Sequence, residues 1–211
     1  MKQKILIATT NQAKLEEIRQ FLSDIPITCV GLRDVGITDS VEETGKTFEE
    51  NAILKARFYA QLSGLPTLAD DGGLEIDALN GEPGIHSHRW IHKDQEDEDE
   101  ELIAYTIQKL RGLPRVKRGG QLRVVVALAL PNGDVHISEG IIRGIIAEKP
   151  SSYRQKGFPY RSLLYLPKLK KFYNHDELAK EENNAYNHRR KAIEKLKPYI
   201  SNLKSQAPNH K

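Results

Sequence analysis

The amino-acid sequence predicts an α/β fold, because its two halves carry different structural patterns. Residues 4–8 form a continuous apolar run, which is typical of a buried parallel strand. The polar residues 9–11 follow and offer N-cap groups to a helical pattern that starts at Ala13. Later, Asn132-Gly133 separates two runs rich in valine, leucine and isoleucine, which predicts a hairpin. We therefore expect an α/β half and a half richer in antiparallel hairpins, arranged as two lobes around a central cleft.

The first half contains two predicted helices and a second strand. A helix is expected over residues 13–22, where leucine and isoleucine recur on one face. Another is expected over 47–62, because Thr47 and Glu50 have the spacing of a capping box. A strand over 66–69 should follow and should end just before two aspartates and two glycines. This strand–helix order is typical of an α/β unit.

The second half is predicted to hold a hairpin and two helices. The hairpin strands should span 122–130 and 135–146. The acidic run 94–101 precedes an apolar-periodic segment, so its carboxylates should face the positive end of a helix dipole. A late helix over 177–196 should end before Pro198.

Composition bounds the class of protein. The chain has 211 residues, 38% hydrophobic and 29% charged, which suits a soluble globular domain without a membrane span. A net charge of +3 without a basic stripe gives no indication of nucleic-acid binding. The single cysteine, Cys29, excludes a disulfide framework and is expected to be buried, and the N-terminus lacks secretory features, which predicts a cytoplasmic protein. We expect one two-lobed domain over 1–200 and a polar tail over 201–211.

A candidate anion site lies where the first strand meets the first helix. Free backbone N–H groups and the positive dipole end at a helix N-terminus favour phosphate, and a lysine in the first turn adds a mobile charge. Taken alone, the same residues also fit an ordinary cap with a solvated lysine. The segment consists of Thr9, Thr10, Asn11, Gln12, Ala13 and Lys14.

A candidate metal site rests on two pairs of carboxylates. Glu42 and Glu43 precede the helix that carries Lys55, and Asp70 and Asp71 follow an apparently buried strand. Loops at the carboxyl ends of strands are where α/β sheets bind ligands. Mg²⁺ prefers one or two carboxylates together with water and phosphate oxygens. By themselves the glutamate pair and Lys55 would suit a solvated surface equally well, but together with the aspartates they favour metal-assisted chemistry.

Four segments of this chain closely resemble the inosine triphosphate pyrophosphatase family. They are residues 9–14, 42–52, 69–74 and 77–85, and the resemblance runs in order from residue 4 to about 197. It implies a two-lobed α/β fold with a mixed, elongated sheet flanked by helices, and a homodimer. It also implies a Mg²⁺-dependent hydrolase that converts deaminated purine triphosphates such as ITP, dITP and XTP to the monophosphate and pyrophosphate.

The resemblance also assigns roles to residues. Thr9 to Lys14 would hold the triphosphate, and Lys55 would help to neutralise it. The metal would bind Glu42 or Glu43 together with Asp71, and Asp71 would be the general base that activates water. Positioning and charge neutralisation supply most of the catalysis in such reactions, so lysines and a metal are sufficient equipment.

The base-binding loop departs from the family pattern. The family has Gly-Phe-Gly-Tyr-Asp-Pro where this chain has Gly157-Phe158-Pro159-Tyr160-Arg161-Ser162. Both aromatic residues remain available to stack on a base, although core packing is the alternative for them. Arg161 only donates hydrogen bonds where an aspartate accepts them, and Pro159 removes a backbone donor.

Further departures lie near the late helix and beside the aspartates. Asn183 and Asn187 replace a lysine and a serine of the family, whereas His188 and Arg189 remain and are expected to donate to a purine O6, unless the pair is only a surface feature. Gly72 stands where serine is usual. Besides the enzyme, the sequence therefore leaves open a nucleotide-binding protein of the same fold with reduced catalysis or shifted base specificity, because of Pro159, Arg161 and Asn183.

Overall fold

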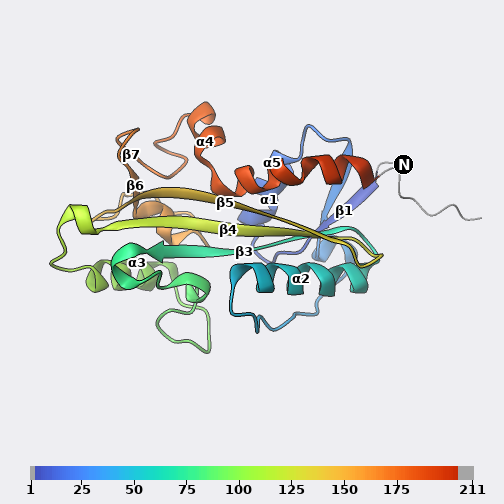
Figure 1. Cartoon of the computed structure of the whole chain (residues 1–211), viewed down its shortest axis with the longest axis horizontal. Coiled ribbons are helices and arrows are strands. Elements are labelled where there is room, and N and C mark those ends of the chain that lie inside the picture. Colours follow the sequence, from blue (N-terminus) through green and yellow to red (C-terminus); the bar gives the residue numbers. More distant parts are fainter. Residues whose placement is uncertain (1–2, 204–211) are drawn as a thin grey trace, which may run out of the picture. The chain divides into compact units, whose positions relative to one another are not determined.

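A computed structural model describes residues 3–203 of the chain. It contains five α-helices and seven strands among these residues, together with short 3₁₀ turns (Figure 1). The strands are β1 Gln3–Ile7, β2 Ile27–Gly31, β3 Thr67–Ile76, β4 Gly119–Ala129, β5 Val135–Ile146, β6 Leu164–Leu166 and β7 Lys171–Phe172. The helices are α1 Gln12–Phe21, α2 Phe48–Ser63, α3 Asp99–Lys109, α4 Lys180–Tyr186 and α5 His188–Ser201.

The strands form a mixed sheet in the order β2-β1-β3-β4-β5-β6-β7. β1 runs parallel to β2 and to β3, whereas β6 runs antiparallel to β5 and to β7. The predicted α/β class and the predicted mixed sheet are therefore confirmed. The sequence analysis did not predict β2, β6 or β7. The last two are very short, with three and two residues.

The chain divides into two compact units, each made of separate segments. Unit 1 takes its described residues from Met1–Asp71, Val124–Gly140 and Arg189–Lys211, and unit 2 comprises Gly72–Arg123 and Ile141–His188. The single domain over 1–200 stays a prediction, and most of the predicted tail, residues 204–211, lies outside the described residues.

Unit 1 has an apolar core between its strands and two helices. Ile5 and Ile7 of β1 point to the same face and pack with the apolar stripes of α1 and α5. Figure 1 shows α5 on that face and α2 on the other. Cys29 packs against this core but is only partly buried, and burial raises the pKa of its thiol. The predicted helices 13–22 and 47–62 correspond to α1 and α2, and Thr47 Oγ1 caps α2 by accepting from Glu50 N at 3.1 Å.

Unit 2 has a core of its own beneath α3. Leu102, Ile103 and Leu110 pack with Leu74 and Ile76 of β3 and with the end of β5. The last three acidic residues of the run 94–101, Asp99 to Glu101, occupy the first turn of α3, which confirms the predicted dipole arrangement for that part of the run. α3 therefore packs on the unit 2 core through the apolar face that the sequence pattern predicts.

The prediction that a strand ends at residue 69 is wrong. β3 continues through Asp70, Asp71, Gly72 and Gly73 to Ile76. The two carboxylates have cationic and amide partners, so they need not face water in a loop. Gly73 allows close packing, because a Cβ atom built there would lie 1.9 Å from Ser87 Oγ. The aspartates therefore stand on a rigid strand.

We expect Gly73→Ala to destabilise the fold by about 1–3 kcal/mol, the usual cost of overpacking. The added methyl group would displace Ser87, whose Oγ accepts from Leu74 N and donates to Gly84 O. Urea denaturation would measure the change. Arg57→Gly, at an exposed position in the middle of α2, is the reference variant. Its lower helix propensity alone should reduce the free energy of unfolding by about 1 kcal/mol. A loss no greater than that would contradict the packing argument.

The single late helix over 177–196 is also wrong. The structure has α4 and α5, separated by Asn187, whose backbone is extended at φ −62° and ψ 116°. Asn187 is fully buried, so its polar side chain favours a fixed place in the fold over continued helix. Pro198 does not end α5 but lies inside its last turns. Proline removes one backbone donor there, and packing of Ile200 in the unit 1 core offsets that loss.

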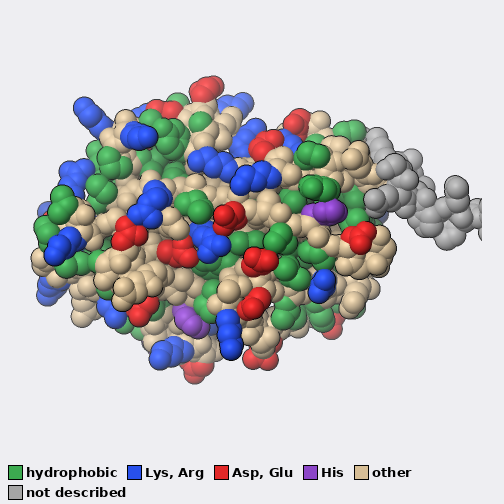
Figure 2. Space-filling view, in the orientation of Figure 1, with side chains coloured by type: hydrophobic (Ala, Val, Ile, Leu, Met, Phe, Trp, Pro, Cys, Tyr) green, Lys and Arg blue, Asp and Glu red, His purple; other side chains and the backbone are tan. Residues whose placement is uncertain are grey.

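Charged side chains of both signs are interspersed over the face shown in Figure 2. This distribution agrees with the small net charge of the chain, +3. Within residues 3–203, the helices are all too short or too polar to cross a membrane.

Candidate functional site

A partly buried lysine joins the predicted catalytic carboxylates of unit 1. Lys55 Nζ on α2 lies 3.1 Å from Glu43 Oε1 and 3.3 Å from Asp71 Oδ1. Asn51, one turn earlier on α2, donates from Nδ2 to Asp71 Oδ2 at 3.1 Å and accepts at Oδ1 from Gly45 N at 2.8 Å. The helix thus fixes both oxygens of Asp71 and holds the loop that carries Glu43.

The protonation of this cluster follows from burial and charge. Burial raises the pKa of Asp71 above its ordinary value, and the nearby Lys55 ammonium opposes that rise. Burial alone would lower the pKa of Lys55, but the carboxylates of Asp71, Glu43 and Asp70 outweigh it and raise that pKa. Lys55 is therefore a fixed cation, and Asp71 is a carboxylate whose proton affinity is enhanced. Such a carboxylate is suited to accept a proton.

A second charged network surrounds Asp70. Lys14 Nζ lies 3.4 Å from Asp70 Oδ2, and the Arg189 guanidinium donates to the same oxygen at 3.1 and 3.2 Å. Arg189 also donates to Glu17 Oε2 at 2.6 Å. Burial would raise the pKa of Asp70, but Lys14, Arg189 and Lys55 hold it well below its ordinary value. Asp70 is therefore ionised at neutral pH and anchors two cations beside Asp71.

The predicted phosphate segment lies at the junction of β1 and α1. Asn11 is the N-cap of α1, and its Oδ1 accepts from Lys14 N at 3.1 Å. Thr9 Oγ1 accepts from Asn11 N at 3.2 Å. Thr10 and Gln12 are exposed and Ala13 is partly buried. The turn therefore presents polar groups and helix N–H groups next to Lys14, as the sequence predicts for an anion site.

The predicted metal ligands are only partly gathered. Glu43 and Asp71 share Lys55, whereas Glu42 is exposed on the loop. In residues 3–203, three or more His, Cys, Asp or Glu side chains do not cluster in a way that could hold a metal ion. The two carboxylates that do converge offer hard oxygen ligands, the type that Mg²⁺ prefers.

The altered loop of unit 2 places Arg161 in a buried position. Its guanidinium carbon lies 4.0 Å from the centre of the Phe158 ring, and Nη1 lies 3.1 Å from both Gln155 Oε1 and His175 Nε2. Arg161 is 3% exposed. A buried guanidinium needs such partners, since an isolated charge is costly inside a protein. Arg161 is therefore held inside unit 2 by its contacts with Phe158, Gln155 and His175.

The other predicted base-binding residues of unit 2 are mostly buried. Tyr160 belongs to the unit 2 core and donates to Ser87 O at 2.5 Å, and burial raises the pKa of its hydroxyl. His188 Nδ1 lies 3.0 Å from Tyr173 OH. Tyr160 therefore packs in the core, which was the alternative to base stacking that the sequence left open for this residue. Three further predicted residues are buried or partly buried, namely Gly72 on β3, Pro159 in the loop and Asn183 on α4.

The sequence-based site assignment gave no role to three polar residues that support these groups. Glu17 lies three residues after Lys14 on α1, and this spacing was the available signal for a shared helix face. Asn51 precedes Lys55 by one turn in the same way. Gln155 gave no signal, because its partners Tyr153 and Arg161 come together only through the fold of the loop.

Known proteins with similar sequences share one type of activity in their names. A protein of Geobacter sulfurreducens named dITP/XTP pyrophosphatase is 37% identical over 197 residues, which cover 93% of this chain and 96% of that protein. Another of that name, from Yersinia pseudotuberculosis, is 40% identical over 195 residues, with 90% and 94% covered.

Solved structures and a family model give the same result. A HAM1 protein from Coxiella burnetii matches with a TM-score of 0.81 at 34% identity, covering 95% of this chain and 100% of that one. The Staphylococcus aureus Ham1 protein matches with a TM-score of 0.77 at 35% identity, covering 94% and 98%. The model of the Ham1 family matches residues 5–199. The chain therefore belongs to the Ham1 family.

Proposed function

We propose that this chain hydrolyses dITP, ITP and XTP to the monophosphate and pyrophosphate. The observation that carries the proposal is the partly buried contact of Lys55 with Glu43 and Asp71, supported by relatives named dITP/XTP pyrophosphatase. Triphosphate cleavage needs neutralised phosphate oxygens and a base for the attacking water. In this proposal the lysines of unit 1 would neutralise the phosphate oxygens, and Asp71 would be the base.

Each unit 1 group has a role in this proposal. Lys14 and the N-terminus of α1 would hold the triphosphate, and Lys55 would neutralise charge near the reacting phosphate. Asp71 would take a proton from a water molecule, whose oxygen forms a bond to the α-phosphorus. The bond from that phosphorus to the bridging oxygen breaks, and pyrophosphate leaves with the electron pair. Asp70 keeps Lys14 and Arg189 in place through its ion pairs.

Mg²⁺ is the proposed cofactor. Glu43 and Asp71 would hold it, with Glu42 as the alternative glutamate, and it would neutralise developing charge on phosphate oxygens. Both predicted ligands that converge are partly buried carboxylates, which suits a cation of this type. The proposed assembly is a homodimer in the cytoplasm that takes a nucleoside triphosphate as its substrate.

Metal removal tests the cofactor assignment. After treatment with EDTA, pyrophosphate release from dITP is expected to fall to background, and added MgCl₂ should restore it. CaCl₂ at equal concentration is the matched control, because Ca²⁺ takes the same oxygen ligands but at longer distances and with looser geometry. Undiminished turnover in EDTA would contradict the proposed role of Mg²⁺.

A substrate panel tests the activity itself. Pyrophosphate release should be measured with dITP, ITP, XTP, GTP, ATP and UTP at saturating Mg²⁺. We expect turnover of the deaminated purine triphosphates above that of ATP. Binding of these nucleotides without hydrolysis of any would favour the second candidate, a nucleotide-binding protein with reduced catalysis, which the changes at Pro159, Arg161 and Asn183 motivate. Turnover with an altered ranking of bases would instead point to shifted specificity.

A further inference from the structure

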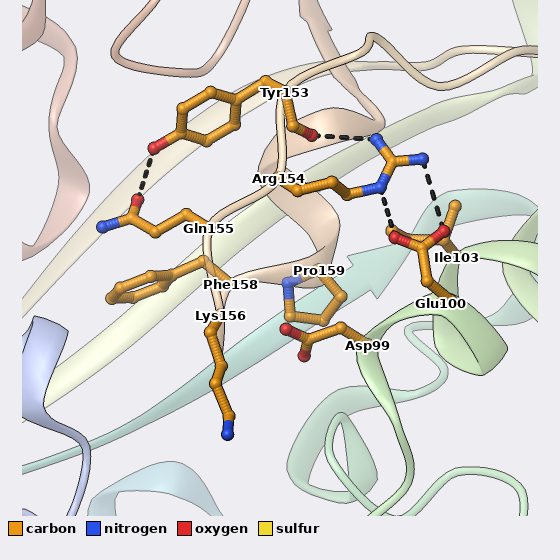
Figure 3. Close-up of a pocket in the computed structure, with 9 residues that line it drawn as sticks. All are labelled: Asp99, Glu100, Ile103, Tyr153, Arg154, Gln155, Lys156, Phe158 and Pro159. Carbon is orange, nitrogen blue, oxygen red and sulfur yellow. Dashed lines mark hydrogen bonds and ion pairs between the residues drawn. The ribbon is translucent and has the colours of Figure 1, made fainter.

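A pocket in unit 2 contains a glutamine that the proposed function has not used. The pocket has a volume of about 190 Å³ and lies between the start of α3 and the loop before residue 160. Gln155 and the ring of Phe158 project to the same side of this loop, and Tyr153 lies next to Gln155 (Figure 3). The Arg161 guanidinium covers one face of the ring, so a ligand that stacks on Phe158 would use the other face.

The orientation of the Gln155 amide is fixed by its partners. Oε1 accepts from Tyr153 OH at 2.7 Å and from Arg161 Nη1 at 3.1 Å. Arginine has donors only, so the amide atom that faces it must be the oxygen. The NH₂ group of Gln155 therefore stands on the opposite branch of the amide. A reversed amide would place two donors against each other.

Arg161 holds the ring and the amide together. The same guanidinium that donates to Gln155 lies 4.0 Å from the centre of the Phe158 ring. It is 3% exposed and also contacts His175 Nε2 at 3.1 Å, so its own position is constrained. Phe158 and Gln155 are consequently fixed relative to each other by one rigid, planar cation.

The cationic side chains that line the pocket are less suited to reading a ligand. Arg154 donates to the Glu100 carboxylate and to the Tyr153 carbonyl oxygen (Figure 3). It also donates to the Ser151 carbonyl oxygen, so most of its donors are occupied. Lys156 is exposed and points away from the Phe158 ring in the same view. The glutamine amide remains the fixed neutral donor beside the ring.

We propose that Gln155 is a specificity-determining residue that donates from its NH₂ group to a carbonyl oxygen of a base stacked on Phe158. Arg161 is the positioning residue that sets the amide orientation. This inference rests on the proposed function and adds the chemical basis of its base preference. Hypoxanthine and xanthine carry a carbonyl oxygen at the purine 6-position, whereas adenine carries an amino group, which would meet the glutamine donor to donor.

Gln155→Glu tests the donor directly. The variant keeps the shape and still accepts from Tyr153 and Arg161, but it replaces the NH₂ group by a second acceptor. We expect kcat/KM for dITP and XTP to fall at least tenfold relative to kcat/KM for ATP, because a base carbonyl would then face a carboxylate. Gln108→Glu, on the exposed face of α3, is the matched control and should leave the ranking unchanged.

Arg161→Met tests the positioning role separately. Without the guanidinium the amide can reverse, so the preference for dITP over ATP should narrow while kcat for dITP falls less than KM rises. If Gln155→Glu folds with an unchanged thermal midpoint and leaves the ranking of dITP, XTP and ATP unaltered, the inference is overturned even though the wild-type protein is active. If the wild-type protein releases no pyrophosphate from any triphosphate, the proposed function fails, and the inference fails with it.

Discussion

Asp71→Asn is expected to lower kcat for pyrophosphate release from dITP by about 10²- to 10⁴-fold, the usual contribution of a general base. Asparagine has nearly the same shape and can still accept from Asn51 Nδ2, but it cannot take a proton from water. It also removes one of the two carboxylates that contact Lys55. The rate should be measured at saturating substrate and Mg²⁺, so that weaker binding does not contribute.

A matched substitution separates catalysis from folding. Asp94→Asn changes an exposed aspartate in unit 2 and should leave kcat within twofold. The Asp71→Asn protein should keep its thermal midpoint or gain stability, because burial disfavours the charged form of Asp71. A folded Asp71→Asn variant with near-normal kcat would remove Asp71 from the mechanism and would direct attention to Glu43 as the base.

The local patterns of the sequence predicted most of unit 1. The apolar run at 4–8, the Thr47 cap and the Asn132-Gly133 turn each act through neighbouring residues, and each appears in the structure near its expected place. Local rules failed where distant groups decide the outcome. The strand β3 continues through two aspartates because Lys14 and Lys55, from other elements, make their burial tolerable.

The candidate site also contains residues that the sequence could mark and residues that only the tertiary structure reveals. Lys14, Lys55 and Asp71 could be assigned from the sequence because the family resemblance marks them, and the structure brings Lys55 to Asp71 and Lys14 to the adjacent Asp70. Helical spacing places Glu17 and Asn51 on the same faces as Lys14 and Lys55, but it assigns them no role, because a polar residue on a helix is usually solvated and only tertiary packing buries these two. The family resemblance therefore marks the proposed reacting groups more readily than the residues that hold them.

Arg189→Met is expected to destabilise the protein by about 3–5 kcal/mol, because it leaves two buried carboxylates without their shared cation. The side chains of Asp70 and Glu17 are only 2% and 8% exposed, so water cannot replace the guanidinium. Lys14 stays within 3.4 Å of Asp70 and limits the loss. Urea denaturation at pH 7 measures the effect, and Arg57→Met, at an exposed position of α2, is the matched control with an expected change below about 0.5 kcal/mol.

The pH dependence of this loss identifies its cause. The folded-state pKa of Asp70 lies below its unfolded value, so its ion pairs stabilise the protein fully at neutral pH, and that contribution disappears as the pH falls through the acidic range below about 4. Protonation also relieves the unpaired carboxylates of the variant. The stability difference between wild type and Arg189→Met should therefore shrink on acidification. A difference that is independent of pH would mean that the methionine disturbs packing, and the charged network would then have little part in holding Asp70 beside Asp71.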